Sequence, residues 1–279
     1  MREDFCAFIL THGRPNKVTT HRTLLAAGYT GKIFIVVDDE DETAEEYKRI
    51  YGDDVLVFSK DEVGRYTDQF DNFSDRRAPL WARNACWGLA RQMGYRYFVQ
   101  LDDDYNSWQY RGMWSGRYAG WNIKTLDTVF EAMVRLIETT TIKTVALSQG
   151  GDHIGGEPTK LYRRKAMNTF VCDTEKPFLF RGRLNDDVTT YVSLGRTGDL
   201  FVTYMPLQIT QPSTQSNSGG VSETYRDSGT YVKSFYTVMA APSCTIIKPL
   251  HNHRATGPRN PRLHHKIDWR RAVPLILRQ

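Results

Sequence analysis

The sequence has few cysteines, and they form no motif. Cys6, Cys86, Cys172 and Cys244 are scattered over 279 residues, and no two of them are closely spaced. A zinc site or a disulfide framework would need such pairs. Scattered cysteines in a chain of this length are typical of buried thiols in a reducing compartment. We therefore expect neither structural zinc nor disulfides.

Long hydrophobic runs are also missing. The longest apolar runs, such as 33–37 and 273–277, are the size of strands, whereas a membrane helix needs roughly 18 apolar residues. The chain opens with charged residues and has no apolar segment of the kind found in signal peptides. We expect no membrane partner and a cytoplasmic location, which is the host cytoplasm if a phage encodes the chain.

Neither sign of charge dominates, but the basic residues are unevenly placed. The net charge is +5, hydrophobic residues make up 40% and charged residues 25%, which is ordinary for a globular protein. From 251 to 279, seven Lys and Arg residues face a single Asp. Such a tail fits a polyanionic partner such as nucleic acid, and a solvated arginine-rich surface is the alternative.

Strands and helices alternate through the first hundred residues. Short apolar runs predict strands at 5–10, 32–37, 55–58 and 97–101, with helices ending near 27, at 43–51 and from 79 to 93. This alternation predicts a mostly parallel sheet covered by helices on both faces. Further on, we expect a helix at 126–137, strands at 144–147 and 200–204, and a loop at 211–220.

No repeat or linker divides the chain, so we predict one domain over 1–279. Polar clusters at 11–14, 38–41 and 102–104 each follow a predicted strand of its first half. In open α/β sheets, ligands bind beyond the carboxyl ends of the strands. The three clusters should therefore meet at one site.

The third cluster is the acidic triplet Asp102-Asp103-Asp104. Carboxylate oxygens suit Mg²⁺ or Mn²⁺, which often also bind substrate phosphates. Alternate residues of an extended chain share a face, so Asp102 and Asp104 can point at one ligand while Asp103 points away. A solvated acidic loop is the alternative.

This region resembles the nucleotide-sugar half of GT-A glycosyltransferases. The resemblance lies in Ala82-Arg83-Asn84, the strand at 97–101 and the acidic triplet, which takes the place of the DxD motif. It implies a GT-A-like, Rossmann-like mixed sheet, with a nucleotide-sugar half at about 1–104 and an acceptor half at about 105–279. It also implies a metal at Asp102 and Asp104, and donor contacts at Thr11, Arg14, Asp38 or Asp39, Arg83, Asp102 and Asp103. For Arg83, a salt bridge on the helix surface is the alternative.

A second acidic group, Asn185-Asp186-Asp187, precedes a more apolar stretch. In inverting GT-A enzymes, a carboxylate in a comparable motif removes the proton from the acceptor hydroxyl. We expect Asp186 to be this base, with Asp187 as the alternate. A helix N-cap is the competing interpretation, and a retaining enzyme would not need the base.

Two adjacent histidines, His264 and His265, lie in the basic tail. Some GT-A enzymes complete the metal shell with a histidine near the C-terminus, and this pair is the preferred source here. A structural or surface role is the alternative.

Four phrases of the second half resemble the TET-associated DNA glycosyltransferases of tailed phages. They are the segments 180–187, 214–220, 229–233 and 262–269, and the resemblance extends from residue 5 to about 277. It implies transfer of a sugar from a UDP-sugar, by default UDP-glucose, to a hydroxymethylated pyrimidine in phage DNA, with 5-hydroxymethylcytosine as the first choice. Asn185 stands where this family has an acidic residue, which puts a paired carboxylate there in doubt.

The segment 105–121 mixes aromatic residues, arginines and glycines, and could stack on an everted base or a sugar. A hairpin whose tryptophans fill the core is the alternative. The predicted acceptor contacts are Trp108, Arg111, Trp114, Arg117, Arg262 and Lys266.

Three other functions compete with DNA glycosylation. A GT-A enzyme could act on a polysaccharide or a protein, although the expected absence of a membrane anchor disfavours this. A nucleotidyltransferase would need a glycine-rich phosphate loop, and 11–16 holds a single glycine. A non-catalytic nucleic-acid-binding protein is the alternative from another class.

Overall fold

The core of the protein is a mixed sheet of nine strands, seen in a computed structural model that describes residues 1–153, 162–212, 224, 231–250 and 262–274. The strand order is β3-β2-β1-β4-β8-β7-β9-β5-β6. The strands are β1 (Phe5–Leu10), β2 (Lys32–Asp38), β3 (Val55–Phe58), β4 (Tyr97–Asp102), β5 (Ser107–Trp114), β6 (Arg117–Asn122), β7 (Ile142–Gln149), β8 (Phe170–Asp173) and β9 (Leu200–Thr210).

Most strands of this sheet run in the same direction. β3, β2, β1 and β4 pair in parallel, as do β7 and β9. Only β8 and β5 are antiparallel to both of their neighbours. The prediction of an α/β fold with a mixed, mostly parallel sheet is therefore confirmed.

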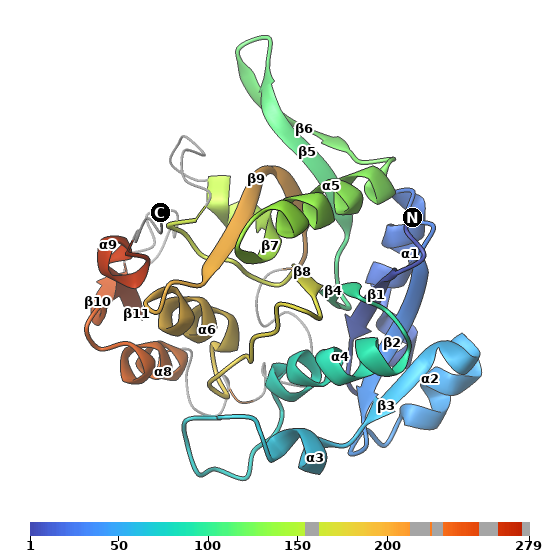
Figure 1. The fold of residues 1–279 in the computed structure, drawn as a ribbon, viewed down its shortest axis with the longest axis horizontal. Coiled ribbons are helices and arrows are strands. Elements are labelled where there is room, and N and C mark those ends of the chain that lie inside the picture. Colours follow the sequence, from blue (N-terminus) through green and yellow to red (C-terminus); the bar gives the residue numbers. More distant parts are fainter. Residues whose placement is uncertain (154–161, 213–223, 225–230, 251–261, 275–279) are drawn as a thin grey trace.

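Helices cover both faces of the sheet (Figure 1). Side chains alternate along β1, with Phe5, Ala7 and Ile9 in one apolar layer and their neighbours in the other. The first layer holds α1 (Thr19–Ala26), α2 (Ala44–Tyr51) and α5 (Leu126–Thr139). The second holds α3 (Lys60–Gly64), α4 (Leu80–Gln92), α6 (Asp186–Gly195) and α9 (Trp269–Ala272).

A small unit flanks α6. There, α8 (Val232–Ala240) packs against a two-stranded antiparallel sheet of β10 (Thr245–Leu250) and β11 (Arg262–Ile267). Figure 1 places this unit with α9 at the opposite side of the molecule from α2 and β3. Part of the predicted basic tail is thus a strand, which the abundance of charged residues there obscured.

The predicted elements of the first half occur within a few residues of their expected bounds. Pro15 opens only a short 3₁₀ helix, Pro15–Lys17, and α1 begins at Thr19. The predicted loop at 211–220 lies mostly outside the described residues. All four cysteines are free and buried, as expected. Among the described residues, no helix is both long and apolar enough to cross a membrane.

The segment 105–121 is a hairpin, but its tryptophans do not share one environment. β5 and β6 pair antiparallel and project from the body of the molecule (Figure 1). Trp114 and Trp121 are 68% and 44% exposed, whereas Trp108 is 2% exposed. The Trp108 indole lies edge-on to Tyr105 and Phe130. The prediction that Trp108 contacts the acceptor is therefore wrong, because the core has taken up this side chain.

We expect Trp108→Ala to lower the free energy of unfolding by about 3–5 kcal/mol, because it removes a buried aromatic ring. Trp114→Ala on the same hairpin should change it by less than about 0.5 kcal/mol, because that ring is exposed. Urea unfolding followed by circular dichroism measures both. Equal losses would contradict the assignment of Trp108 to the core.

Candidate active site

The polar clusters that follow β1, β2 and β4 lie beside one another. These strands are neighbours in the sheet and parallel, so their carboxyl ends meet at one edge. Thr11 Oγ1 donates a hydrogen bond of 2.5 Å to Asp103, and His12 Nδ1 lies 2.8 Å from Asp38 Oδ2. The predicted convergence of the three clusters is confirmed.

Asp103 braces this edge from inside. Its side chain is 1% exposed, and Oδ2 accepts from Thr11 and, at 2.7 Å, from Arg14 Nε. Burial raises the pKa of Asp103, and the Arg14 charge opposes that rise. Asp103 points away from the partners of Asp102, as the alternation predicted. The donor contact expected of Asp103 stays a prediction, and its Oδ2 already accepts from two protein groups.

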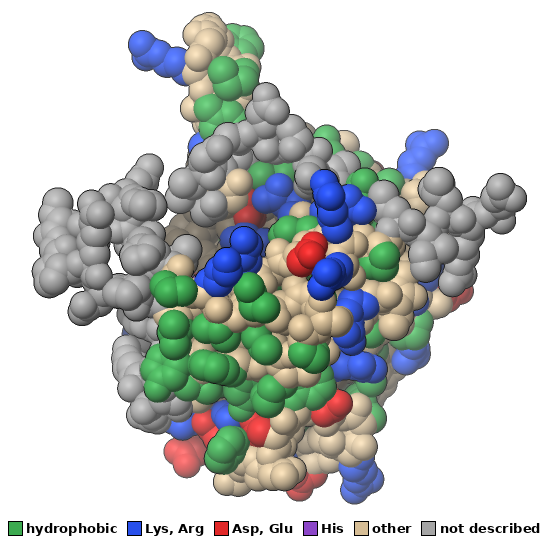
Figure 2. All heavy atoms as spheres, turned by 90° about the vertical axis from the view of Figure 1, so that its left-hand side faces the viewer, with side chains coloured by type: hydrophobic (Ala, Val, Ile, Leu, Met, Phe, Trp, Pro, Cys, Tyr) green, Lys and Arg blue, Asp and Glu red, His purple; other side chains and the backbone are tan. Residues whose placement is uncertain are grey.

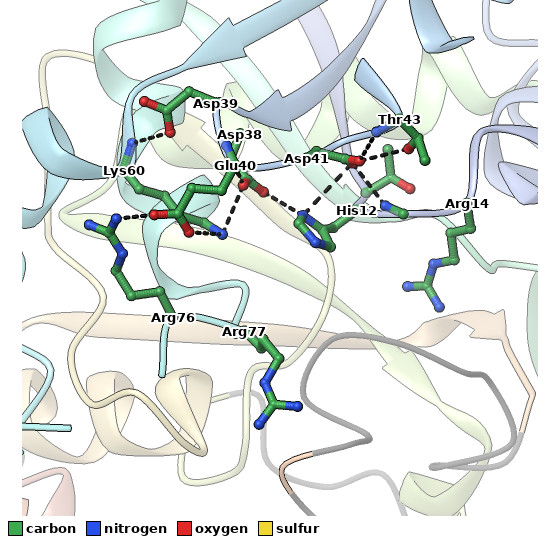
Figure 3. A network of polar contacts seen from close by, with 12 residues as sticks. His12, Arg14, Asp38, Asp39, Glu40, Asp41, Thr43, Lys60, Arg76 and Arg77 are labelled. Carbon is green, nitrogen blue, oxygen red and sulfur yellow. Dashed lines mark hydrogen bonds and ion pairs between the residues drawn. The ribbon is translucent and has the colours of Figure 1, made fainter. Parts of the chain in front are cut away.

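The cluster after β2 is a network of ion pairs and hydrogen bonds (Figure 3). Asp38 accepts from His12 and lies 2.8 Å from Lys60 Nζ. Although burial acts to raise it, these two hydrogen bonds lower the pKa of Asp38, and Asp38 in turn raises the pKa of His12. Asp39 accepts from the backbone N–H of Lys60. Asp38 is therefore an ionised, immobilised carboxylate at the mouth of the sheet.

Sequence reasoning missed three residues of this edge. They are His12, Lys60, which is 5% exposed, and Tyr47, whose hydroxyl contacts Thr11 Oγ1 and accepts from the backbone N–H of Arg14. His12 lay inside a recognised cluster. Lys60 carried a usable signal, since it lies two residues past β3, at the same sheet edge. Tyr47 looked like any apolar residue of an amphipathic helix.

Arg83 on α4 joins the two acidic motifs. Nη2 lies 3.2 Å from Asp102 Oδ1, and Nε lies 3.0 Å from Asp186 Oδ2. The guanidinium is 3% exposed and lies 5.0 Å and 5.4 Å from the ring centres of Phe170 and Phe180. A surface salt bridge is therefore the wrong interpretation of Arg83. It is a buried cation between carboxylates that lie 84 positions apart in the sequence.

The carboxylates around Arg83 outnumber it. Burial raises the pKa of Asp102 to about 7 and that of Asp186 to about 6, although Arg83 acts against both shifts. The pKa of Asp187 is raised by burial as well. The Asp104 charge adds to the rise at Asp102. The site thus holds an excess of negative charge that a bound cation would offset.

Tyr105 fixes the backbone directly behind the acidic triplet. Its hydroxyl accepts from the Asp102 N–H and donates to the Asn168 carbonyl. Its own N–H and carbonyl bond to the hydroxyls of Thr20 and Thr23 on α1. The chain between the triplet and the β5–β6 hairpin is therefore held at several points.

The start of α6 is not capped in the usual way. Asn185 has the left-handed conformation, with φ of 60°, and its side chain makes no cap bond. Asn185 Nδ2 donates to Thr237 Oγ1 at 2.6 Å and lies 3.4 Å from His265 Nδ1. Asp187 Oδ1 accepts from the adjacent N–H of Val188. The N-cap interpretation is wrong for Asn185, which instead ties α6 to α8 and β11.

The predicted metal set does not assemble. Within the described ranges, no three His, Cys, Asp or Glu side chains lie together as a metal site. The rings of His264 and His265 on β11 are tilted by 46° with centres 4.2 Å apart, and burial lowers the pKa of His265 to about 3. The pair joins no such group with Asp102 and Asp104 among the described residues, and His265 Nδ1 lies 3.4 Å from Asn185 Nδ2.

The remaining predicted acceptor residues are dispersed. Arg111, Trp114 and Arg117 lie on the β5–β6 hairpin, where Arg111 stacks on the Tyr118 ring. Lys266 is exposed on β11. The Arg262 side chain lies outside the described residues. The structure thus provides two separate surfaces, the hairpin and β11, where acceptor contacts are expected.

Comparison with known proteins identifies a family. The sequence model of the TET-Associated Glycosyltransferase family matches residues 5–220. Among curated proteins, the LPS-assembly protein LptD of Sodalis glossinidius is 30% identical over 83 residues, 30% of this chain. The chain spans about a tenth of the length of that protein.

Several solved structures resemble the fold weakly. The chain is 11% identical to the Mycobacterium tuberculosis glucosyl-3-phosphoglycerate synthase complex with Mg²⁺ and UDP, with a TM-score of 0.46, covering 95% of this chain and 88% of that one. For the complex of the same enzyme with Mn²⁺, UDP-glucose and phosphoglyceric acid, the identity is 10% and the TM-score is 0.46. The match covers 93% of this chain and 86% of that one. For a further mycobacterial protein, the identity is 11% and the TM-score is 0.47, and the match covers 94% of this chain and 84% of that one.

We expect Arg83→Gln to lower the free energy of unfolding by about 3–5 kcal/mol at pH 8, because it leaves buried carboxylates without a countercharge. The folded pKa values of Asp102 and Asp186 lie above the ordinary 3.8. The folded state therefore keeps protons that the unfolded state loses, and stability falls as pH rises from about 4 to 7. The cost of Arg83→Gln should accordingly shrink at pH 5, where both carboxyls are mostly protonated.

Urea unfolding of metal-free protein at pH 5 and pH 8 measures this difference. Arg91→Gln is the matched control, because Arg91 lies on the same helix with an exposed side chain. Losses at Arg83 that do not change with pH would contradict the charge assignment.

Proposed function

The chain belongs to the TET-associated glycosyltransferase family, and from this premise we propose that it transfers a sugar from a nucleotide-sugar to the hydroxymethyl group of a modified pyrimidine in DNA. The donor class we propose is a UDP-sugar, with UDP-glucose as the first candidate, and the acceptor base is 5-hydroxymethylcytosine. One observation carries the proposal. Arg83 holds Asp102 of the sheet edge and Asp186 of α6 on one guanidinium, so a donor site and an acceptor base would be neighbours.

The carboxyl edge of β1, β2 and β4 is the proposed donor site. Asp38 and Asp39 supply carboxylate oxygens for the nucleoside, and the loop that carries Thr11 and Arg14 lies beside them. Arg83 is the buried cation nearest to the triplet. These groups suit a ligand with hydroxyls at one end and phosphates at the other.

Asp102 and Asp104 are the proposed holders of Mn²⁺ or Mg²⁺. The fit rests on the excess of negative charge around Arg83 and on hard oxygen donors at a partly open sheet edge. When bound, such a cation would offset the charge that builds on the diphosphate leaving group. Neither histidine is needed for this proposal.

We assign the general base to Asp186, with Asp187 as the alternate. The acceptor oxygen attacks the anomeric carbon while the bond from that carbon to the diphosphate breaks, and the electron pair leaves with the diphosphate. The hydroxyl proton passes to the Asp186 carboxylate. Its pKa of about 6 leaves it ionised at neutral pH, yet more basic than an ordinary aspartate. Arg83 keeps the carboxylate aimed at the donor side.

The β5–β6 hairpin supports a nucleic-acid acceptor. Its exposed aromatic residues include Trp114 and Trp121, and its charged residues are Arg111 and Arg117. Residues 105–122 contain no Asp or Glu. Aromatic rings beside arginines suit bases and phosphates. The hairpin starts directly after the triplet, so a strand bound there would lie near the donor.

Asp104→Ala should reduce sugar transfer by roughly 100-fold or more while the fold is retained, because a metal-holding carboxylate is lost. The assay combines the protein, Mn²⁺ or Mg²⁺, a panel of UDP-sugars and DNA containing 5-hydroxymethylcytosine, with unmodified DNA alongside. Mass spectrometry of the digested nucleosides detects a gain of one hexose. Asp53→Ala, at an exposed site remote from the triplet, is the matched control.

Transfer at a near wild-type rate in Asp104→Ala would refute the metal assignment. Donor hydrolysis without transfer by the wild-type protein would refute the acceptor. A gain of mass on unmodified DNA would refute the requirement for the hydroxymethyl group.

The kcat for transfer should rise with pH through about 6 and then level off, because Asp186 must be ionised to accept the proton. Asp186→Asn should lower kcat by about 100-fold or more and remove this step. Asp187→Asn should lower kcat less and keep the step. If Asp187→Asn alone removed the step, the base would be Asp187.

A further inference from the structure

A cleft of about 400 Å³ opens between the end of α6 and the two-stranded sheet β10–β11. Three lysines line it, Lys165, Lys248 and Lys266, and Tyr191 and Trp269 supply aromatic surface. None of its lining residues is acidic. Figure 2 faces the side of the molecule that carries β10, β11 and α9, and Lys and Arg side chains predominate around the middle of that face.

The positive charge of this lysine cleft is only partly neutralised inside the protein. Lys165 lies 3.2 Å from Asp152, which it shares with Arg164 at 3.3 Å. Lys248 and Lys266 are exposed and have no carboxylate partner in the part of the chain that the structure describes. Asp268, at the rim, caps α9 through the Arg270 N–H and pairs with Arg271. The cleft is therefore suited to an anion.

The aromatic wall of the cleft is rigid. The rings of Tyr191 and Trp269 stack with centres 5.8 Å apart and planes 20° apart, and Tyr191 is 3% exposed. Only the Trp269 side of this pair is partly open to solvent. An aromatic face beside lysines is the combination that binds a sugar-phosphate chain and its bases.

The inner end of the cleft reaches the proposed catalytic motif. Tyr191 lies one helical turn beyond Asp187 on α6, and His265 contacts Asn185, the residue before Asp186. An anion in the cleft would thus lie within a few residues of the group that receives the acceptor proton.

We propose that the lysine cleft binds the phosphodiester backbone of the acceptor strand, beside the nucleotide that receives the sugar. This rests on the proposed function, and it adds a site separate from the donor edge and from the β5–β6 hairpin. Lys248 lies on β10, Lys266 on β11 and Lys165 in the loop before β8, and the first two are exposed, so the cleft can follow a chain along the surface. Its role is to place the hydroxymethyl group at Asp186 by holding neighbouring phosphates.

The test compares Lys248→Gln/Lys266→Gln with Lys32→Gln/Lys48→Gln. The control pair loses the same charge from β2 and α2, at the other side of the molecule. Anisotropy of a fluorescent single-stranded oligonucleotide with one 5-hydroxymethylcytosine gives Kd from 50 to 300 mM KCl. The slope of log Kd against log salt should fall by about 1.4 for the loss of two phosphate contacts, and the control pair should keep the wild-type slope.

Transfer kinetics separate the cleft from the chemistry. The cleft variant should lose about 10-fold or more in kcat/KM on the oligonucleotide and nothing on the free nucleoside 5-hydroxymethyldeoxycytidine, which has no phosphate. Lys248→Arg/Lys266→Arg should restore both slope and kcat/KM. Thermal unfolding confirms that all variants fold.

Three outcomes would overturn the proposal. An unchanged salt slope in the cleft variant means that no phosphates bind there. Equal losses on oligonucleotide and nucleoside mean that the lysines serve the reaction itself. Competition by millimolar inorganic phosphate as strong as by unlabelled DNA means that the cleft takes a small phosphate compound instead. If the wild-type protein transfers no sugar, the proposed function fails, and the anisotropy slope still decides the role of the cleft.

Discussion

The ion pairs of the buried Arg83 side chain are the interaction on which the acidic edge depends. A lone guanidinium in an apolar setting between Phe170 and Phe180 would be strongly destabilising. Its contacts with Asp102 and Asp186 remove that cost and, in doing so, fix the distance between the end of β4 and the start of α6. A single residue of α4 thereby holds the proposed donor edge and the proposed general base beside each other.

The same arrangement leaves the edge overloaded with carboxylates. Such crowding is unfavourable for folding, and proteins retain it where a ligand offsets the charge. Burial, with a smaller contribution from neighbouring carboxylates, raises the pKa values of Asp102 and Asp186. By contrast, Asp38 and Asp103 have dedicated protein partners. The edge thus contains aspartates with their own protein partners and two aspartates, Asp102 and Asp186, that share the single charge of Arg83.

Much of the fold followed from local patterns. The runs at 5–10, 32–37 and 97–101 are apolar on both faces, which only a covered parallel sheet accommodates, and the polar residues after them had to converge. Contacts that depend on distant parts of the chain could not be read in this way. Arg83 was predicted to contact the donor, with a surface salt bridge as the alternative, and its pairing with Asp186 could not be foreseen because Asp186 follows some hundred residues later. Trp108 was predicted with the other hairpin aromatics, because its burial depends on α5. β8 has only four residues and lies antiparallel between β4 and β7, which come from different halves of the chain. It was too short to show a hydrophobic period in the sequence.

The hydrogen bonds of Tyr105 anchor the base of the β5–β6 hairpin to the body of the protein. The hairpin is exposed and projects from the body of the molecule. Tyr105, the residue after the triplet, accepts from the Asp102 N–H and donates to Asn168 and to Thr20 of α1. A displacement of the tip would therefore meet this anchored residue before it reached Asp102. The outer part of the hairpin can therefore vary in length and sequence without changing the position of Asp102.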